Sequence, residues 1–470
     1  MKLFGHVRSG AEVSDGPARF WTFVIDCRLA SLGSRLSGIG RFVSCFAQAL
    51  TEQLNQQPQW KGSRILLVSR TAPEPWMISL AKEYPHVVGF ESWNPGSRWA
   101  RLRVPLFAWA SFMFSTYQKK FGKKFIWIAP GNIDRPLVPS WGANRKREQI
   151  VQIIHDTIPL LKHKGTGFLF KMQYRLLMRQ ALLRLPNIFT CSQTSANHLR
   201  SLFPKRKDSI SIVPYGLEQR FGSRTLRATE VEKKQLKENF LSKVMGSLPP
   251  AETKYLKKAR WILGVGRNEQ YKNWEFAQDV VKLLRQKNPN EEFVWIHVGA
   301  NFEKVTKKSN TVRKVPKTED HGKNEAIGVF CWGTECNIGL SSLPDMELVD
   351  LYYASDLLIH PSSEEGFGFP PLEASLCGLP VLYLESTAIK EHFPRGLLPS
   401  FFWNGLPNLK TDSWANAAQE ALFSSSCAEF LNGIGKFEKS RDFFDHVSRE
   451  STFLWKNTAT RFLGQIALPD

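Results

Sequence analysis

The segment from residue 351 to residue 373 constrains the fold more than any other part of the chain. It contains the end of a helical pattern, an apolar strand at 357–360, a glycine-rich turn at 366–368, and then Pro370 and Pro371, which suit the first turn of a helix. A strand, a turn and a helix in this order present free backbone N–H groups and the positive end of a helix dipole. Such a unit suits a phosphate group or a sugar oxygen, so the segment predicts an anion-binding turn.

Two glutamates flank this turn. Glu365 stands at the turn, and Glu373 follows just inside the predicted helix. Because ionised carboxylates only accept hydrogen bonds, they can accept them from hydroxyl groups beside the anion. Anion donors and hydroxyl acceptors in one place indicate a nucleotide-sugar site. The alternative is that both glutamates are solvated residues near a helix start, where acidic side chains are favoured in any case.

Short apolar strands alternate with helical stretches along the whole chain. Strands are expected at 20–26, 64–69, 125–128, 150–155, 187–191 and 210–213, and again at 260–264, 292–299, 329–332, 357–360 and 380–383. Residues 28–40 are expected to form a loop and residues 41–54 a helix. This alternation predicts an α/β protein with parallel, doubly wound sheets. A length of 470 residues suits two domains with a core each.

The spacing Glu365-x7-Glu373, between a Pro-Ser pair and a Cys-Gly-Leu-Pro segment, closely resembles the Glu-x7-Glu signature of the retaining glycosyltransferases of family 4. Further segments follow that family's pattern in order: 37–41, 155–159, 190–195, 213–216, 264–273, 297–300 and 348–356. The resemblance implies the GT-B fold, in which two Rossmann-like domains face a cleft. The segments at 26–41 and 155–159 look most like the mannosyltransferase branch of surface-glycan enzymes.

The resemblance also implies roles for individual residues. The catalytic residues would be Glu365, holding the sugar hydroxyls, and His155, approaching the donor sugar. The donor-binding residues would be Arg267, Lys272, Gly366, Phe367, Gly368, Glu373, Gly38 and Gly40. Within this set the two cations would hold the diphosphate, and Glu373 would grip the ribose. A lone histidine after an apolar strand is alternatively structural, and a short glycine pair is alternatively only a flexible turn.

Four segments are expected along the chain. Residues 1–216 would form the acceptor-side domain, and residues 217–258, which are rich in charge, would connect the domains. Residues 259–440 would form the nucleotide-sugar-binding domain. The family resemblance implies that residues 441–470 form a helix that crosses back to the first domain.

No metal or other cofactor is expected. Cys331 and Cys336 lack a second Cys/His pair at zinc spacing, and no Asp-x-Asp motif lies beside the donor motifs. The resembled family is generally metal-independent. The seven scattered cysteines indicate a reducing compartment, and no apolar run approaches the roughly 20 residues of a spanning helix. A cytoplasmic protein is therefore expected.

The net charge of +20 indicates an anionic partner. Two stretches, at 101–124 and 168–185, combine basic residues with aromatic and aliphatic ones, which suits the surface of an anionic membrane. One interpretation is therefore a peripheral position on the inner face of the plasma membrane. The alternative is that both helices pack on a sheet with solvated lysines and arginines. The chain lacks the sequence signatures of zinc fingers, basic zippers and RNA-binding aromatics, which disfavours nucleic acid as a partner.

Together these features predict a retaining transferase that moves a hexose to a growing, lipid-linked glycan. The first choice of donor is GDP-mannose, which would supply mannose. UDP-hexose or dTDP-rhamnose donors, or a soluble acceptor, are alternatives within the same class. An alternative of another class is an inactive glycosyltransferase-like scaffold that binds membrane or nucleic acid. The intact Arg267, Lys272, Glu365 and Glu373 argue against the scaffold.

Overall fold

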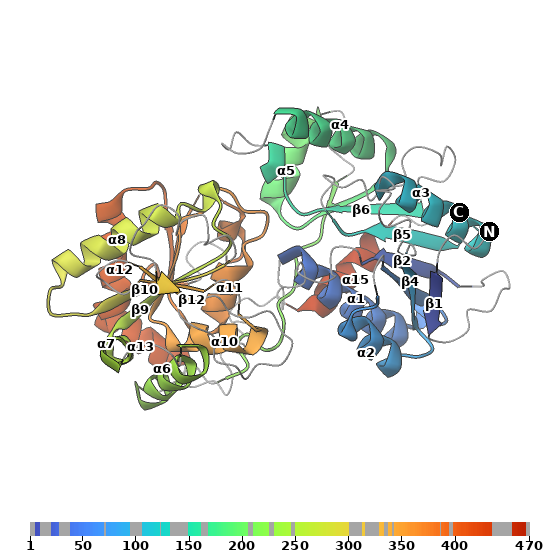
Figure 1. Cartoon of the computed structure of the whole chain (residues 1–470). Helices are drawn as coiled ribbons and strands as arrows, with labels where there is room; N and C mark the ends of the chain where they lie inside the picture. The colour runs from blue at the N-terminus through green and yellow to red at the C-terminus, as the bar shows by residue number, and fades with distance from the viewer. Residues whose placement is uncertain are drawn as a thin grey trace. The chain divides into compact units, whose positions relative to one another are not determined.

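The computed structural model of the protein describes residues 5–9, 20–27, 38–69, 72–94, 106–122, 124–131, 149–160, 168–204, 210–224, 230–245, 250–299, 313–314, 329–332, 337–340, 343–385, 387–393, 398–434 and 454–466. The predicted features at residues 28–37, 101–105, 123, 300, 336 and 435–453 lie outside these ranges. The chain divides into two compact units, one of residues 1–216 with 452–470 and one of residues 217–451, and each is described by itself (Figure 1).

The first unit contains an eight-stranded sheet in the order β1-β4-β3-β2-β5-β6-β7-β8. Its strands are β1 (Gly5–Ser9), β2 (Thr22–Asp26), β3 (Arg64–Ser69), β4 (Val88–Asn94), β5 (Phe125–Ala129), β6 (Ile150–Ile154), β7 (Asn187–Thr190) and β8 (Ile210–Ile212). Strand β1 pairs antiparallel with β4, and the other pairings are parallel. The strand order reverses between β2 and β5, as in a doubly wound sheet.

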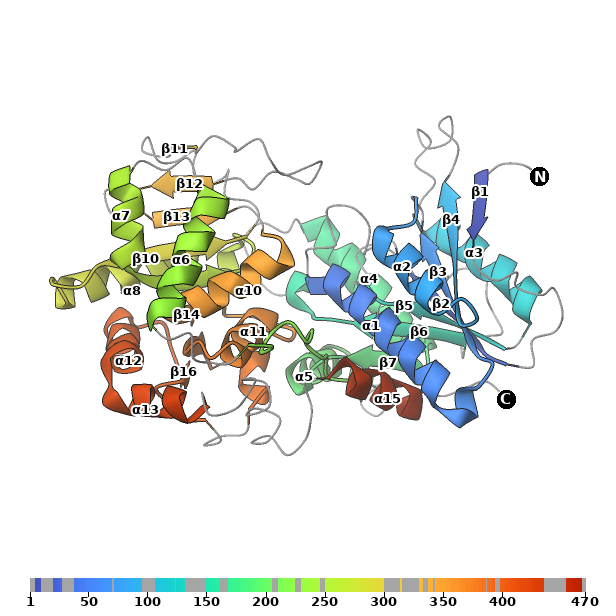
Figure 2. The same ribbon diagram turned by 90° about the horizontal axis from the view of Figure 1, so that it is seen from below.

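Helices cover both faces of this sheet. They are α1 (Gly38–Gln56), α2 (Pro75–Glu83), α3 (Leu106–Phe121), α4 (Phe168–Arg184), α5 (Gln193–Leu202) and α15 (Trp455–Gln465), with short 3-10 turns η2 (Pro58–Trp60) and η4 (Ile158–Leu160). Ile188 of β7 belongs to the core that α3 and α4 share, whereas the next residue, Phe189, packs on Phe462 of α15. Because neighbouring strand residues point to opposite faces, α15 lies on the other face from α3 and α4. There it lies beside α1, where Phe46 meets Phe462 (Figure 2).

The start of α1 corrects a prediction. The helix begins at Gly38, not at residue 41, so Gly38 and Gly40 lie in its first turn and not in a loop. Glycine disfavours helices by roughly 0.5–1 kcal/mol, which is why the sequence pattern placed the start after this pair. In a first turn the backbone N–H groups have no helical partner in any case, and the buried Phe42 and Phe46 hold the helix on the sheet.

The second unit contains an eight-stranded sheet in the order β11-β12-β13-β10-β9-β14-β15-β16. Its strands are β9 (Arg260–Val265), β10 (Phe293–Val298), β11 (Arg313–Lys314), β12 (Val329–Trp332), β13 (Asn337–Leu340), β14 (Leu357–His360), β15 (Val381–Leu384) and β16 (Trp403–Leu406). The six from β13 to β16 are parallel, and β11 and β12 are antiparallel additions at one edge. The order reverses between β9 and β14, which are hydrogen-bonded neighbours.

The helices of this unit are α6 (Glu230–Met245), α7 (Pro250–Lys258), α8 (Trp274–Lys287), α10 (Asp345–Ala354), α11 (Phe369–Leu376), α12 (Thr411–Phe423) and α13 (Ser425–Ile434), with 3-10 turns η6 (Gln270–Lys272) and η7 (Ala388–Glu391). Helices α8 and α12 share one core through Trp274, Trp414 and small apolar residues. The charged segment at 217–258 lies in this unit, where ion pairs join its helix α6 to α10 and to the start of β14.

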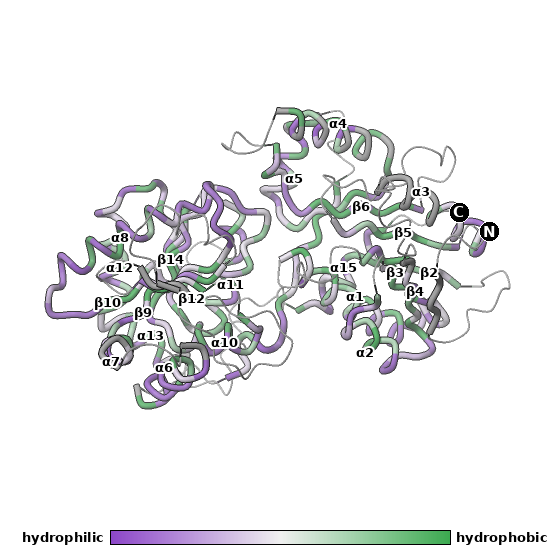
Figure 3. Tube along the Cα trace, in the orientation of Figure 1, coloured by the Kyte–Doolittle hydropathy of each residue, from purple (hydrophilic) through white to green (hydrophobic). Residues whose placement is uncertain are grey.

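The α/β prediction with two doubly wound sheets is confirmed, with corrections at the edges. Strands β1, β11 and β12 are antiparallel, which is common at the edge of a parallel sheet. Strands β13 and β16 were not predicted because each contains an asparagine and a glycine, residues that strands disfavour. The central strands are apolar, as buried parallel strands are (Figure 3). None of the helices in the described ranges combines the length and the apolar character that crossing a membrane requires.

Candidate active site

The carboxyl ends of β9 and β14 form the switch point of the second sheet. In such sheets ligands bind in the crevice outside the carboxyl ends of the strands where the strand order reverses. Two loops emerge there, at residues 266–273 after β9 and at residues 361–368 after β14. The predicted anion-binding turn is the second of these loops, so the fold places it where a ligand site is expected.

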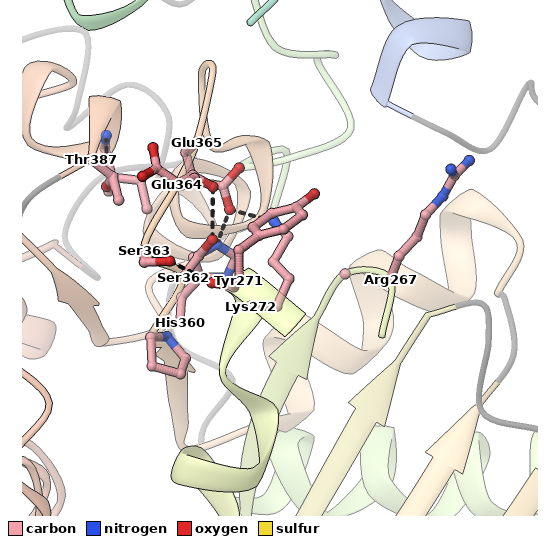
Figure 4. A network of polar contacts seen from close by, with 12 residues as sticks. Arg267, Tyr271, Lys272, His360, Ser362, Ser363, Glu364, Glu365 and Thr387 are labelled. Atoms are coloured by element: carbon pink, nitrogen blue, oxygen red, sulfur yellow. Dashed lines mark hydrogen bonds and ion pairs between the residues drawn. The ribbon is translucent and has the colours of Figure 1, made fainter. Parts of the chain in front are cut away.

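Hydrogen bonds join the two loops to each other (Figure 4). The Nδ2 atom of Asn273 donates to the carbonyl of Pro361 at 2.9 Å, and the backbone N–H of Ser363 donates to the carbonyl of Tyr271 at 2.8 Å. Asn273 has a φ of 54°, in the left-handed region that asparagine tolerates better than most residues. The loops therefore form one assembly, although 88 residues of sequence separate Asn273 from Pro361.

Three polar side chains with little exposure meet on this assembly. Glu365 Oε1 accepts a hydrogen bond from His360 Nε2 at 2.6 Å and forms an ion pair with Lys272 Nζ. The side chains of Lys272 and Glu365 are each 10% exposed, and His360 is fully buried. We call Lys272, His360 and Glu365 the Glu365 cluster. It joins the 3-10 turn η6, the last residue of β14 and the glycine turn.

The charges of the Glu365 cluster follow from its surroundings. Burial raises the pKa of the Glu365 carboxyl, but the charge of Lys272 and the hydrogen bonds from His360 and Lys272 outweigh burial and bring this pKa to about 2. Burial lowers the pKa of His360 below its ordinary value, against the opposing effect of Glu365. Because an ionised carboxylate only accepts, Nε2 of the neutral His360 carries the proton. At neutral pH the cluster thus presents an ionised Glu365 between a lysine and a neutral histidine.

Trp274 and His297 support the cluster from the side of the sheet. The Trp274 ring lies 4.6 Å from the ring of His297 and 5.7 Å from that of His360. Its Nε1 donates to the carbonyl of Arg267 at 3.0 Å, and His297 Nε2 donates to the carbonyl of Gly266 at 2.8 Å. Burial lowers the pKa of His297 to about 3, so its ring is neutral at neutral pH. The first loop is therefore fixed at both Gly266 and Arg267.

The two predicted diphosphate ligands occupy different environments. Arg267 and Lys272 lie in the same loop, as predicted, but the side chain of Arg267 is exposed and projects away from the Glu365 cluster (Figure 4). Gly266 precedes Arg267 with a φ of 146°, a conformation that favours glycine. The loop thus brings only Lys272 into the cluster.

The glycine turn is anchored by the aromatic residue within it. Phe367 is buried and packs on His392, with a distance of 4.6 Å between ring centroids. Gly368 has a φ of 87°, and an added Cβ would lie 2.6 Å from Ile389, so glycine is required there. Gly366, Phe367 and Gly368 are all buried, so the turn is packed into the unit directly before α11.

Glu373 belongs to a different set of contacts. It lies in α11, is 1% exposed, and accepts a hydrogen bond from the hydroxyl of Tyr352 in α10 at 2.9 Å. The alternative of a solvated surface glutamate is wrong for both residues of the pair, because Glu373 is buried and the side chain of Glu365 is only 10% exposed. The spacing in sequence places Glu365 on a loop and Glu373 on a packed helix.

In the first unit His155 follows β6 and is buried. Its Nε2 lies 3.2 Å from the carbonyl of Pro130, which can only accept, so this nitrogen donates and Nδ1 accepts from the hydroxyl of Tyr215 at 2.6 Å. Burial lowers the pKa of His155 to about 4. The ring of Phe42 packs on it at 5.0 Å, which places the helix that begins with Gly38 beside it. These contacts fit a structural role, and an approach to the donor sugar stays a prediction.

No role was predicted from the sequence for five residues of this site: His360, His297, Trp274, Tyr271 and Asn273. His297 and His360 were visible as polar residues at the carboxyl ends of apolar strands, and this position was the available signal. The contacts of the other three depend on two loops that only the sheet brings together. Among the described residues, no group of three or more His, Cys, Asp or Glu side chains is placed to hold a metal ion.

Comparison with known proteins finds a family match within the second unit. Residues 259–422 match the model of the family described as glycosyl transferases group 1. A D-inositol 3-phosphate glycosyltransferase of Corynebacterium jeikeium is 26% identical over 175 residues, which is 37% of this chain and 35% of that protein. The O-antigen chain mannosyltransferase B of Escherichia coli is 44% identical over 52 residues, 11% of this chain and 14% of that protein. The chain thus matches about a third or less of either relative's length.

Solved structures resemble almost the whole chain. Sucrose-phosphate synthase from Thermosynechococcus elongatus has a TM-score of 0.57 at 14% identity, with 95% of this chain and 98% of that chain covered. WaaG, a glycosyltransferase involved in lipopolysaccharide biosynthesis, has a TM-score of 0.53 at 13% identity, with 92% and 99% covered. At such identities the likeness shows the fold alone. The fold is the two-domain α/β fold of GT-B glycosyltransferases, and with the group 1 match it supports a GT-B glycosyltransferase.

Proposed function

We propose that the protein is a retaining glycosyltransferase that moves a hexose from a nucleotide sugar to a hydroxyl group of a glycan. The observation that carries this proposal is the Glu365 cluster at the switch point between β9 and β14, inside the residues that match the group 1 family. A buried ionised carboxylate, a lysine and a glycine turn meet there. These are the groups that a sugar joined to a diphosphate requires.

The lysine would stabilise the leaving group. Breaking the bond between the anomeric carbon and the phosphate oxygen leaves its electron pair on the diphosphate. Positive side chains and helix N-terminal amides stabilise such developing charge most where water is excluded. Lys272 is nearly buried and already held in place by Glu365, so little reordering is needed when a diphosphate arrives. Arg267, exposed on the same loop, is the second cation of this proposal.

The carboxylate would act on the sugar. Glu365 is ionised at neutral pH and can accept hydrogen bonds from sugar hydroxyls, while its charge stabilises the positive charge that develops on the ring. His360 orients this carboxylate through its Nε2–H. In a front-face reaction the acceptor oxygen bonds the anomeric carbon on the side that the phosphate leaves. The acceptor's proton then passes to the departing phosphate oxygen, and no separate base is needed.

The mechanism requires no metal ion, because side chains neutralise the diphosphate. Activity with EDTA is therefore expected to equal activity without it, measured as nucleotide release under otherwise identical conditions. A complete loss with EDTA that Mn²⁺ or Mg²⁺ restores would contradict this part of the proposal.

GDP-mannose is the first donor we propose, and a lipid-linked surface glycan on the cytoplasmic side of the membrane is the acceptor. The short similarity to the O-antigen chain mannosyltransferase B supports a mannosyl donor and a surface-glycan acceptor. UDP-hexoses and dTDP-rhamnose are the competing donors.

The test is incubation of the purified protein with each nucleotide sugar in turn, with released nucleotide as the measurement. Slow release from GDP-mannose, accelerated by a mannose-containing acceptor glycolipid, is expected. NMR of the product's anomeric proton should show the configuration of the donor. Release from UDP-hexose or dTDP-rhamnose alone would correct the donor and keep the class. A folded protein that neither binds nor cleaves any donor would establish the inactive scaffold instead.

A further inference from the structure

Helix α4 carries apolar side chains on two opposite sides. On its inner side Tyr174, Met178 and Leu182 are buried in the core of the first unit, against Trp127 and the strands. This agrees with the alternative that the helix packs on a sheet. It accounts for one side of the helix only.

The outer side is apolar as well. Leu169, Met172, Leu176 and Leu183 are between 43% and 73% exposed. At about 100° per residue, these four positions fall within an arc of about 60°. We call them the α4 stripe. Of the nine large hydrophobic residues that are exposed within the described part of the chain, four belong to this stripe, so the exposure is concentrated and not scattered.

Basic residues border the α4 stripe on one side. Arg175 and Arg179 are exposed, and their positions lie between the buried side of the helix and the stripe. The sequence contains no acidic residue between Asp156 and Asp208. Helix α6 differs, because three of its lysines pair with acidic residues of the same unit, as Lys243 does with Glu347. The charge that α4 itself carries is thus of a single sign.

The neighbouring helix extends the basic region. Helix α3 lies on the same face of the first sheet as α4, and both contribute to one core (Figure 1). Its last turn carries the exposed Lys119, and the exposed Lys124 follows it. The described parts of the two basic stretches noted in the sequence, on α3 and α4, therefore belong to one layer of one unit.

We propose that the α4 stripe docks the protein on an anionic lipid surface. A helix lying in the membrane interface buries an apolar stripe at the level of the lipid headgroups and places basic side chains against phosphates. The stripe runs for about 20 Å along an exposed helix, at 1.5 Å per residue, and its rim complements negative charge only. An anionic bilayer presents negative charge along the whole length of the helix, which matches a rim of one sign. The biological sense of the docking rests on the proposed function, because it would bring a lipid-linked acceptor to the enzyme.

The test uses flotation of the full-length protein with phosphatidylcholine vesicles, with and without phosphatidylglycerol. Wild-type protein is expected to float with the vesicles that contain phosphatidylglycerol and to dissociate as salt increases. The double variant Met172→Gln/Leu176→Gln removes the middle of the stripe, and Arg175→Gln/Arg179→Gln removes its rim. Each should lower the partition coefficient about tenfold or more, because both contributions are needed for stable binding.

Two control variants are matched in chemistry and lie in the second unit. Lys254→Gln/Lys258→Gln removes the same net charge from exposed positions of α7, and Val231→Gln removes an exposed apolar side chain of α6. Both should bind vesicles like the wild type. Circular dichroism should show that all variants are folded.

Three results would overturn the proposal. One is wild-type protein that does not float with either kind of vesicle. Another is equal loss of binding in the α7 control, which would make the effect one of net charge alone. The third is a wild-type dimer that Met172→Gln/Leu176→Gln makes monomeric without loss of vesicle binding, because the stripe would then serve a second copy. Vesicle binding needs no nucleotide sugar, so failure of the proposed function would leave this test intact.

Discussion

Strand β14 has a buried carboxylate cluster at each end, and the two clusters differ in what they can do. At its amino end Asp356 contacts Lys233 and Lys237, which we call the Asp356 cluster. At its carboxyl end lies the Glu365 cluster, with Lys272 and His360. In both clusters burial raises the carboxyl pKa, and neighbouring lysines more than reverse the effect. By residue type and charge alone the two are hard to distinguish.

The Asp356 cluster is built on regular structure. Lys233 and Lys237 stand one turn apart on α6 and contact the two carboxylate oxygens at 2.5 and 3.2 Å. The backbone N–H of Trp261 in β9 donates to Asp356 at 2.7 Å, and Lys237 also donates to the carbonyl of Ala259. Each oxygen of this carboxylate is occupied by rigid elements, so the cluster fastens α6 to the sheet.

The Glu365 cluster is built on loops. Its members come from a 3-10 turn, a strand end and a glycine turn, at the switch point of the sheet. Loops on a rigid scaffold are where binding residues concentrate. The position of a cluster in the sheet topology, more than its composition, therefore distinguishes a stabilising ion cluster from a candidate site.

Replacement of Asp356 should give the largest effect, and on stability alone. In Asp356→Ala the buried Lys237 loses its counter-ion, which typically costs about 3–5 kcal/mol of unfolding free energy. The activity of the folded fraction should stay unchanged. Urea unfolding of the second unit is the measurement. The control is Asp412→Ala, because Asp412 is 81% exposed and pairs with Lys287 only at the surface, where such pairs contribute less than about 1 kcal/mol. Similar losses in both variants would contradict a stabilising role.

Replacement of Lys272 should lower the activity of the folded protein, which replacement of Asp356 should not. In Lys272→Ala the leaving diphosphate loses its buried cation, and turnover should fall on the order of a hundredfold or more, about 2.7 kcal/mol. Arg267→Ala tests the second proposed cation in the same assay. Lys258→Ala, at an exposed position of α7, is the matched control and should retain wild-type turnover. If Lys272→Ala also retained it, the cluster would be structural like that of Asp356.

Acid should destabilise the structure around the carboxyl end of β14 at a higher pH than the structure around its amino end. Burial lowers the pKa of His297 to about 3, and that of His392, beside the glycine turn, to about 4. Both are neutral when folded and bind a proton when unfolded below about pH 6.5, so the unfolding free energy falls as the pH drops. By pH 5 each contributes a loss of up to about 2 kcal/mol. The lowered pKa of Asp356 acts in a lower pH range, because its stabilisation is complete above about pH 4 and is lost only as the pH falls below that value.

Urea unfolding at pH 7 and pH 5 checks this expectation. His297→Gln should reduce the difference between the two pH values, whereas Asp356→Ala should leave that difference at its wild-type size. The opposite result would mean that the amino end of the strand carries the acid sensitivity.

Replacement of either glutamate of the motif should change one kinetic constant about tenfold, and that constant should be kcat for Glu365 and the donor KM for Glu373. Glu365→Gln keeps the shape of the side chain but removes the charge near the reacting sugar, so it should chiefly lower kcat. Glu373 is proposed to contact the ribose, an interaction similar in the ground and transition states, so Glu373→Gln should chiefly raise the KM for the donor. Donor titrations of both variants decide this, and a reversed pattern would exchange the two roles. If neither constant changed, Glu365 would join Asp356 as a structural carboxylate.

The sequence by itself determined the local pieces of this protein. Apolar runs of the right length predicted β3, β12 and β14 at their observed bounds, and the glycines with the two prolines predicted the turn before α11. These features depend on neighbouring residues, which is why a single sequence reveals them. Glu365 could be selected for the same reason, since its turn is a local motif.

The tertiary structure alone decided which pieces meet. Lys272 reaches Glu365 across 93 residues because β9 and β14 are adjacent at the switch point, and Glu373, eight positions away, is fixed instead by Tyr352. The two apolar sides of α4 also look alike in sequence, and only the sheet beneath Tyr174 decides that Leu176 faces solvent. Strand order and burial arise from packing the whole unit at once, and no local pattern contains that information.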